Sequence, residues 1–388
     1  MDTIQRGIIS LIRAAVTQQS QALPEGFDLE AAGQQIRRHH IAALAFEGAA
    51  VCGIPPFLPA MQPLLRTYCR ALQVSEGQLR ELARITAAFD EAGIDYMPLK
   101  GCNMKPRYPK PELRTMGDAD ILIRLEQYEK ISAVMESLGF THKEETDHEL
   151  VWQSPNLYVE LHKRLMPSYN RDFHAYFGDG WKLAKVRTGC RLAMTAEDEF
   201  VYLFTHFAKH YRDGGIGCRH VADLWVFLRS TPGLDEARVR RELRKLGLLE
   251  FHENMRGLLD VWFGGAPADE KTDFMTDYIF GSGSFGTGES RVLSRAVRDT
   301  KHTLPGVSGR MLYLWQTAFP PLAALREKYR VLRKAPWLLP AVWLVRPFYK
   351  LLFERDTLGK QEQNLSALRP ENIQSRQDAL RYVGLDYI

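Results

Sequence analysis

Two aspartates that lie two positions apart, Asp118 and Asp120, are the residues of this chain best suited to chemistry. The aliphatic run 121–123 follows them and is typical of a buried β-strand. Residues i and i+2 of a strand point to the same face, so both carboxylates are expected on one side of a sheet. Neighbouring carboxylates repel each other, and a divalent cation between them relieves that repulsion. Oxygen ligands of this kind favour Mg²⁺ or Mn²⁺, which commonly hold phosphate-bearing substrates.

The segments on either side of this pair can supply a phosphate turn and a third acid. Upstream, a short strand is expected to lead through a turn at Lys100 and Gly101 into a helix. Glycine at such a turn allows the backbone to approach phosphate closely, and a helix N-terminus favours an anion. Downstream, another short strand can bring Glu160 to the same edge of the sheet. His162 shares the face of Glu160 and would order that acid, touch a phosphate or lie in solvent.

Taken in this order, the segments resemble the uncharacterised bacterial nucleotidyltransferase-like proteins of the DNA polymerase β superfamily. The resemblance covers roughly residues 40–290 and depends on these segments: Leu99-Lys100-Gly101, Arg114, Gly117 to Ile123, Gly139-Phe140, Val159 to His162, His206 to His210, Arg219 and Asp223-Leu224. It implies transfer of a nucleoside monophosphate from an NTP to an acceptor, with release of pyrophosphate. It also implies catalytic residues that hold Mg²⁺ or Mn²⁺ (Asp118, Asp120 and Glu160) and nucleotide-binding residues (Lys100, Gly101, Arg114 and His162).

One position departs from the usual pattern of the superfamily. Where the wider superfamily carries Gly-Gly or Gly-Ser at the phosphate turn, this chain reads Lys100-Gly101-Cys102 and lacks the hydroxyl. The lysine would compensate as a point charge on the phosphates. The alternatives are that the nucleotide sits differently or that activity is lost.

A group of later residues is expected to line a cleft that faces the catalytic sheet: His206, Lys209, His210, Arg219 and Asp223. His206 and His210 have the i, i+4 spacing of helical metal ligands. No acid lies between them, so we interpret them as cleft residues rather than as a metal site. Arg114 precedes the first aspartate by four positions, and it would reach a triphosphate or form a salt bridge with a neighbouring acid.

The elements predict an α/β (α+β) fold in which a small mixed-sheet nucleotidyltransferase core is flanked by helical N- and C-terminal regions. The expected divisions are an N-terminal helical region (1–92), the core (93–194), a helical domain (195–279), a Gly/Ser-rich linker (280–290) and a C-terminal helical region (291–388). Inside the core we expect six strands, near 95–99, 118–123, 140–145, 149–153, 157–162 and 191–194. Helices are expected at 101–108 and 127–138, and an irregular loop at 165–180.

Composition excludes several classes of protein. A net charge of +4, from 51 basic and 47 acidic residues, argues neither for nor against a nucleic-acid partner. Five scattered cysteines without a C-x-x-C pair argue against a disulfide framework and against a structural zinc site. We therefore expect a cytoplasmic protein. No signal peptide is expected, because the N-terminus has an early acid, Asp2, and only a short apolar run before Arg13.

The segment 335–353 is apolar and aromatic, but three prolines and Arg346 interrupt it. Its uninterrupted part is shorter than the ~20 residues that a membrane-spanning helix requires, so no transmembrane segment is expected. A buried C-terminal helix pair is the first interpretation, and a peripheral membrane contact through 335–353 is the second.

The partners implied by the resemblance are an NTP and an acceptor that is a small molecule, a protein or an RNA. The alternative function is a catalytically degenerate fold that acts as a binding or scaffold protein. The three acids argue against it, because an inactive site has no physical need for carboxylates that repel each other.

Overall fold

The computed structural model describes most of the chain, namely residues 1–284, 286, 288–301, 311, 315, 318–320, 322–325, 329, 331–353 and 368–386. Contacts divide it into two compact units. The first unit holds Met1–Ala208 and Ile216–Ser284, and the second holds Lys209–Gly215 and the chain after Ser284. The division falls inside the Gly/Ser-rich stretch 280–290.

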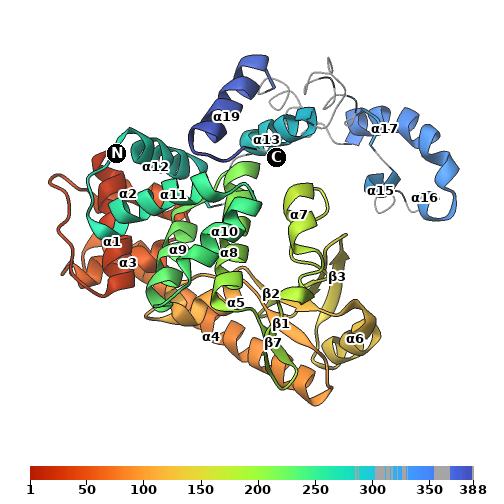
Figure 1. Ribbon diagram of the computed structural model, residues 1–388, viewed down its shortest axis with the longest axis horizontal. Coiled ribbons are helices and arrows are strands. Elements are labelled where there is room, and N and C mark those ends of the chain that lie inside the picture. The colour runs from red at the N-terminus through yellow and green to blue at the C-terminus, as the bar shows by residue number, and fades with distance from the viewer. Residues whose placement is uncertain are drawn as a thin grey trace. The chain divides into compact units, whose positions relative to one another are not determined.

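The first unit begins with helices, as the sequence predicted for 1–92: α1 (Thr3–Thr17), α2 (Leu29–Arg38), α3 (Ala42–Val51), the short 3₁₀ helix η1 (Pro59–Met61) and the long α4 (Gln62–Glu91). Helices α1 and α3 approach so closely that a Cβ at Gly48 would come within 1.9 Å of the Leu11 carbonyl oxygen. Glycine is therefore required at that crossing. The helix α4 extends from this bundle along the sheet (Figure 1).

A seven-stranded mixed sheet forms the centre of the first unit, in the order β3-β4-β5-β2-β1-β7-β6. Its strands are β1 (Tyr96–Pro98), β2 (Asp118–Ile123), β3 (Thr141–Glu145), β4 (Glu149–Gln153), β5 (Tyr158–His162), β6 (Val186–Thr188) and β7 (Arg191–Ala193). The central strand β2 runs parallel to β5 and antiparallel to β1. The mixed sheet and its flanking helices confirm the α/β (α+β) fold class.

One face of the sheet is covered by α4 and by α6 (Tyr128–Ser137), both visible beside the strands in Figure 1. Phe89 of α4 and Met135 of α6 pack there against Ala119, Ile121 and Ile123 of β2. Side chains alternate along a strand, so the other residues of β2, including both aspartates, face the opposite side. The core thus fixes which face of the sheet carries the acids.

Between the strands lie α5 (Gly101–Met104), α7 (Arg171–Phe177) and four 3₁₀ turns: η2 (Lys105–Arg107), η3 (Pro111–Leu113), η4 (Leu125–Gln127) and η5 (Trp181–Leu183). The helix predicted at 101–108 is therefore a single α turn followed by 3₁₀ structure, because Pro106 interrupts it. Two elements were missed. The helix α7 lies inside the predicted loop 165–180, and its buried Phe173 and Phe177 show the i, i+4 spacing that would have revealed it. The strand β6 is exposed throughout and carries no alternation.

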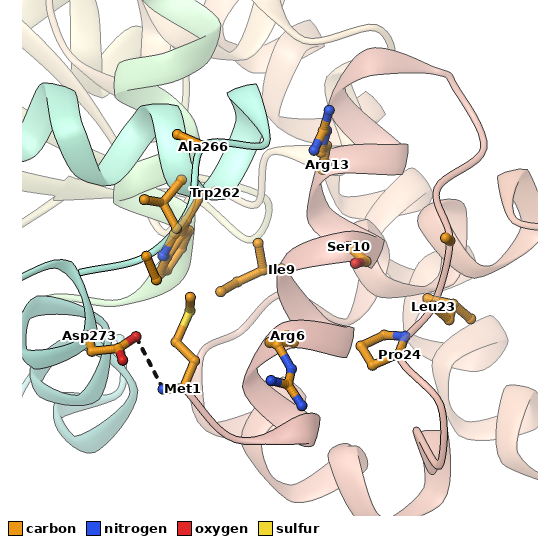
Figure 2. Close-up of a pocket in the computed structure, with 13 residues that line it drawn as sticks. Met1, Arg6, Ile9, Ser10, Arg13, Leu23, Pro24, Trp262, Ala266 and Asp273 are labelled. Atoms are coloured by element: carbon orange, nitrogen blue, oxygen red, sulfur yellow. Dashed lines mark hydrogen bonds and ion pairs between the residues drawn. The ribbon is translucent and has the colours of Figure 1, made fainter. Parts of the chain in front are cut away.

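The rest of the first unit is helical, as the sequence predicted for 195–279. It contains α8 (Ala196–Asp213), α9 (Cys218–Ser230), α10 (Glu236–Lys245), α11 (Leu249–Leu259), the π-helical turn η6 (Asp260–Gly264) and α12 (Glu270–Ser282). The last residues of α8, from Lys209 onward, group with the second unit. A pocket of about 560 Å³ lies between α1, the loop at Leu23 and the segment from η6 to α12 (Figure 2). None of the predicted site residues lines this pocket.

The second unit contains α13 (Gly288–Lys301), α15 (Leu322–Leu325), α16 (Val331–Lys334), η7 (Pro336–Leu338), α17 (Leu339–Phe353) and α19 (Pro370–Tyr382). The predicted linker 280–290 is thus entered by α12 from one side and by α13 from the other. Within 335–353, Trp337 and Leu344 are 74% and 73% exposed, so the buried helix pair expected there is wrong. Pro340 does not break α17, because it stands in the first turn of the helix. Among the described residues, none of the helices combines the length and the apolar character needed to cross a bilayer.

Candidate active site

The turn after β1 holds Lys100 in a backbone conformation that normally requires glycine. Its φ of 40° and ψ of −109° lie close to the first central position of a type II′ turn, which glycine dominates. A side chain at such a position costs about 1–3 kcal/mol of backbone strain. The preceding residue, Leu99, donates its N–H to the Asp120 carbonyl at 2.9 Å, which fixes the turn beside β2. The fold therefore places a lysine next to the aspartates at an energetic cost.

Five side chains meet on the face of the sheet opposite α4 and α6, and we call them the acid cluster: Asp118, Asp120, Glu160, Lys100 and His162. The parallel pairing of β2 with β5 sets Asp120 opposite Glu160. Lys100 Nζ donates to Asp120 Oδ1 at 2.7 Å, and His162 Nε2 lies 2.8 Å from the same oxygen. His162 Nε2 is also 3.5 Å from Glu160 Oε2. The histidine is buried between the two acids, so it does not lie in solvent at the strand end.

Charge and burial set the protonation of the cluster. Burial, and then the charges of Asp120 and Glu160, raise the pKa of Asp118 to about 7. Burial alone would also raise the pKa of Asp120, but Lys100 and His162 hold it well below its ordinary value. Burial and the Lys100 charge oppose protonation of His162, yet its hydrogen bonds to Asp120 and Glu160 raise its pKa. The carboxylates are thus crowded enough for Asp118 to keep a proton near neutral pH.

The donor set fits a divalent cation. Asp120, Glu160 and His162 each offer a ligand atom, and these atoms lie within 4.8 Å of one another. Asp118 lies within the electrostatic reach of this group, because the charges of Asp120 and Glu160 both act on it. Carboxylate oxygens are the ligands that Mg²⁺ and Mn²⁺ prefer, and imidazole is compatible with Mn²⁺. The predicted metal set of Asp118, Asp120 and Glu160 therefore shares two members with this group, and His162 is the additional candidate.

A second acid–histidine pair borders the cluster and was missed by sequence reasoning. Glu149, at the beginning of β4, is the register partner of His162 on β5. His148 Nε2 lies 3.0 Å from Glu149 Oε2, and the rings of His148 and His162 are 6.0 Å apart. Burial opposes it, but the hydrogen bond from His148 and the charges of His162 and Lys100 lower the pKa of Glu149. Only the strand pairing reveals this position, because no motif surrounds Glu149.

Tyr202, on α8, is the other residue that sequence reasoning missed. Its side chain is 2% exposed, and its hydroxyl has no hydrogen-bond partner among the described residues. Burial raises the pKa of Tyr202, and the charges of Lys100, Asp120 and Glu160 also act on it. A buried donor without a partner, within the electrostatic reach of the cluster, is an unusual feature that demands an explanation.

Arg114 forms a salt bridge with Asp223 of α9, which is one of the two roles predicted for it. Its role in nucleotide binding stays a prediction. Arg114 Nε and Nη2 each lie 3.1 Å from one oxygen of the Asp223 carboxylate, which forms a bidentate buried pair. Tyr108 donates its hydroxyl to the same carboxylate at 2.8 Å. Arg219 donates to the Thr115 carbonyl at 2.5 Å. Asp223 and Arg219 therefore anchor the segment that leads into β2.

Gly101 packs directly against the Arg114 side chain. A Cβ at Gly101 would lie 2.9 Å from Arg114 Nη1 and 3.0 Å from Met116 Sδ. Its φ lies outside the left-handed region, so packing rather than backbone freedom explains the glycine. The space beside Gly101 is filled by protein side chains, and its role in nucleotide binding stays a prediction.

The remaining residues of the predicted cleft have different surroundings. The His206 ring lies 6.4 Å from the ring of Tyr202 on the same helix. Lys209 and His210 belong to the second unit. A single cleft formed by these residues with Arg219 and Asp223 stays a prediction.

The mixed sheet thus gathers three carboxylates, a lysine and a histidine on the face opposite α4 and α6. Residues 25–264 match the family described as uncharacterised nucleotidyltransferase, over more than half of the chain. The chain belongs to this family, which confirms the resemblance seen in the sequence. None of the curated proteins matches. Among solved structures, the solution structure of the antibiotic-resistance factor ANT(2'')-Ia is similar, with 16% identity, a TM-score of 0.31 and coverage of 44% of this chain and 94% of that one.

Proposed function

We propose that this protein transfers a nucleoside monophosphate from an NTP to an acceptor and releases pyrophosphate, with Mg²⁺ or Mn²⁺ as cofactor. The observation that carries the proposal is the convergence of Asp118, Asp120 and Glu160 around buried cationic groups on adjacent strands. Membership in a nucleotidyltransferase family supports the class of reaction.

The residues of the acid cluster are expected to have two roles, the acids in binding the cation and Lys100 in binding the phosphates. Asp118, Asp120 and Glu160 would hold the divalent cation, which supplies charge neutralisation for the attacking and leaving oxygens when it is bound. Lys100 would bind the triphosphate as a point charge, at the turn between β1 and α5. Positioning and charge neutralisation supply most of the catalysis in such phosphoryl-transfer reactions.

The reaction forms one bond and breaks one bond at the α-phosphorus. An acceptor hydroxyl attacks this phosphorus, and the bond to the oxygen that bridges to the β-phosphorus breaks. The electron pair of that bond leaves with pyrophosphate. The proton of the acceptor passes to Glu160, whose side chain is 24% exposed and is the accessible acid beside His162. The acceptor is a small molecule, a protein or an RNA.

Calorimetry with each NTP, with and without millimolar Mg²⁺ or Mn²⁺, tests the first half of the proposal. The second half requires α-labelled NTPs and fractionated lysate as a source of acceptors. D118N, D120N and E160Q should lose transfer of the label. The matched control is E144Q, which changes an exposed acid on β3 of the same sheet. Absence of metal-dependent NTP binding would reject the enzyme and favour the binding or scaffold alternative.

A further inference from the structure

Lys100 combines two features that are seldom found together. Its backbone occupies the glycine-favoured region described above, and its ammonium group is buried against Asp120 at 2.7 Å, with 15% of the side chain exposed. Glycine would adopt this turn without strain. A structural ion pair alone does not require a lysine at a strained position, since other sites on the sheet face are less constrained. Strain of this kind clusters at functional sites.

The ammonium group of Lys100 contacts a carboxylate oxygen of Asp120, a residue of the candidate metal site. Asp120 Oδ1 accepts from both Lys100 Nζ and His162 Nε2, and Asp120 belongs to the group that could hold a metal ion. A divalent cation at this oxygen would face the ammonium charge at close range. Even with the screening of bulk water, two cations that share one carboxylate oxygen repel strongly enough to weaken metal binding by roughly tenfold to a hundredfold.

We propose that Lys100 is a resident counter-cation that competes with the divalent metal at Asp120 until a nucleotide draws its ammonium group onto the triphosphate. This inference rests on the proposed function. In the nucleotide-free protein, Lys100 neutralises the acids and keeps the metal weakly bound. A triphosphate offers the lysine a new anion, because its flexible four-carbon stem can move between two partners. Metal and NTP therefore bind together, although either alone binds weakly.

The direct test is Mn²⁺ affinity without nucleotide, measured by electron paramagnetic resonance of free Mn²⁺. K100M removes the charge, and K100G removes both the charge and the backbone strain. Both should bind Mn²⁺ about tenfold more tightly than the parent protein. The matched control is K163M, which removes a lysine that pairs with Glu145 at 2.6 Å, outside the cluster. K163M should bind Mn²⁺ within about threefold of the parent, since screened distant charges contribute little.

The second readout is the coupling between ligands. A non-hydrolysable NTP should tighten Mn²⁺ binding to the parent at least tenfold, and should tighten binding to K100M by a much smaller factor. Unchanged Mn²⁺ affinity in K100M and K100G, or an equal gain in K163M, would overturn the inference. Should both Lys100 variants fail to fold, the NMR signal of the Lys100 side chain in ¹³C-lysine-labelled parent decides. This signal should shift little with Mg²⁺ alone and strongly with Mg²⁺ and NTP together. A strong shift with Mg²⁺ alone and little further change with NTP would refute the competition.

These outcomes separate the inference from the proposed function. A parent protein that transfers label normally while K100M gains no Mn²⁺ affinity would overturn the competition and leave the transferase intact. A parent that transfers no label, but whose Mn²⁺ affinity rises in both Lys100 variants, would remove the proposed reaction and keep Lys100 as the counter-cation. A protein that binds no Mn²⁺ in any variant overturns both.

Discussion

Replacement of Tyr202 by phenylalanine should make the protein more stable and less active at the same time. The hydroxyl of Tyr202 is buried without a partner among the described residues, and a donor in that state costs about 1–3 kcal/mol relative to solution. Removal of the hydroxyl keeps the ring, which packs against Phe177 at a centroid distance of 5.8 Å. We therefore expect the free energy of unfolding of Y202F, without ligand, to rise by about 1 kcal/mol, or about 2–4 °C in melting temperature.

Activity should move in the opposite direction. Because Lys100 and the acids act electrostatically on the Tyr202 hydroxyl, we expect it to donate a hydrogen bond to the bound nucleotide or acceptor. Loss of that bond should lower kcat/KM by about tenfold, the equivalent of one hydrogen bond to a charged group. The assays are denaturant unfolding without ligand and label transfer under the conditions found for the parent.

Tyr96 provides the matched control, because it is equally buried but its hydroxyl donates to Asp90 Oδ2 at 3.1 Å. Y96F should lose about 1 kcal/mol of stability, since it leaves an acceptor unpaired. A Y202F protein that is destabilised like Y96F would show that the hydroxyl has a structural partner. A stabilised Y202F with unchanged kcat/KM would show that the hydroxyl does not meet substrate.

Three further predictions concern charge. D118N should nearly abolish transfer yet stabilise the metal-free protein by about 1–2 kcal/mol. Because the pKa of Asp118 is about 7 in the folded protein, the parent loses stability as the pH rises from about 4 to 7, and the advantage of D118N should grow over that window. Thermal melts that show the same difference between the two proteins at every pH would contradict this prediction. His252 is buried, neither of its ring nitrogens has a hydrogen-bond partner among the described residues, and burial lowers its pKa to about 4. Because the unfolded chain binds the proton first, the free energy of unfolding should fall by up to about 3 kcal/mol between pH 6.5 and 4. H252F should reduce this pH dependence of the urea midpoint, and an unchanged dependence would contradict the prediction. D223N should destabilise the protein by about 3–5 kcal/mol, because it leaves the buried Arg114 charge without compensation. D223L combined with R114M should recover part of that loss in thermal melts. A double variant whose loss of stability equals the sum of the two single losses would show that the two side chains act independently.

The acid face of the sheet was predictable because strand periodicity determines it. Alternation along 118–123 assigned the aspartates to one face and Ala119 and Ile121 to the core, and the structure has this arrangement. The approach of Glu160 followed from a second strand of matching character, although the sequence did not give its parallel register with Asp120. Local patterns are sufficient when one face of an element is buried, since a slip of one residue would expose the core.

The contacts that complete the site come from parts of the chain that no local pattern connects. Arg114 pairs with Asp223 across 109 positions of sequence, and Tyr202 approaches the acids from a helix that begins after the sheet is complete. The amphipathic spacing of that helix accounts for its burial but gives no reason for a hydroxyl at one position. Such residues become visible only when packing has fixed the neighbours of each side chain.

The phosphate turn shows most clearly how local rules and function diverge. Sequence reasoning assigned the special backbone to Gly101 and the charge to Lys100, yet the structure gives the positive φ to the lysine. Gly101 instead leaves the space that the Arg114 guanidinium occupies. The two residues of this turn therefore support different contacts, Lys100 the ion pair with Asp120 and Gly101 the packing of Arg114. A chain that satisfied only the turn would carry glycine at position 100 and would leave Asp120 without its closest cation. The violation of a local preference at this position therefore marks the residue on which metal binding should depend.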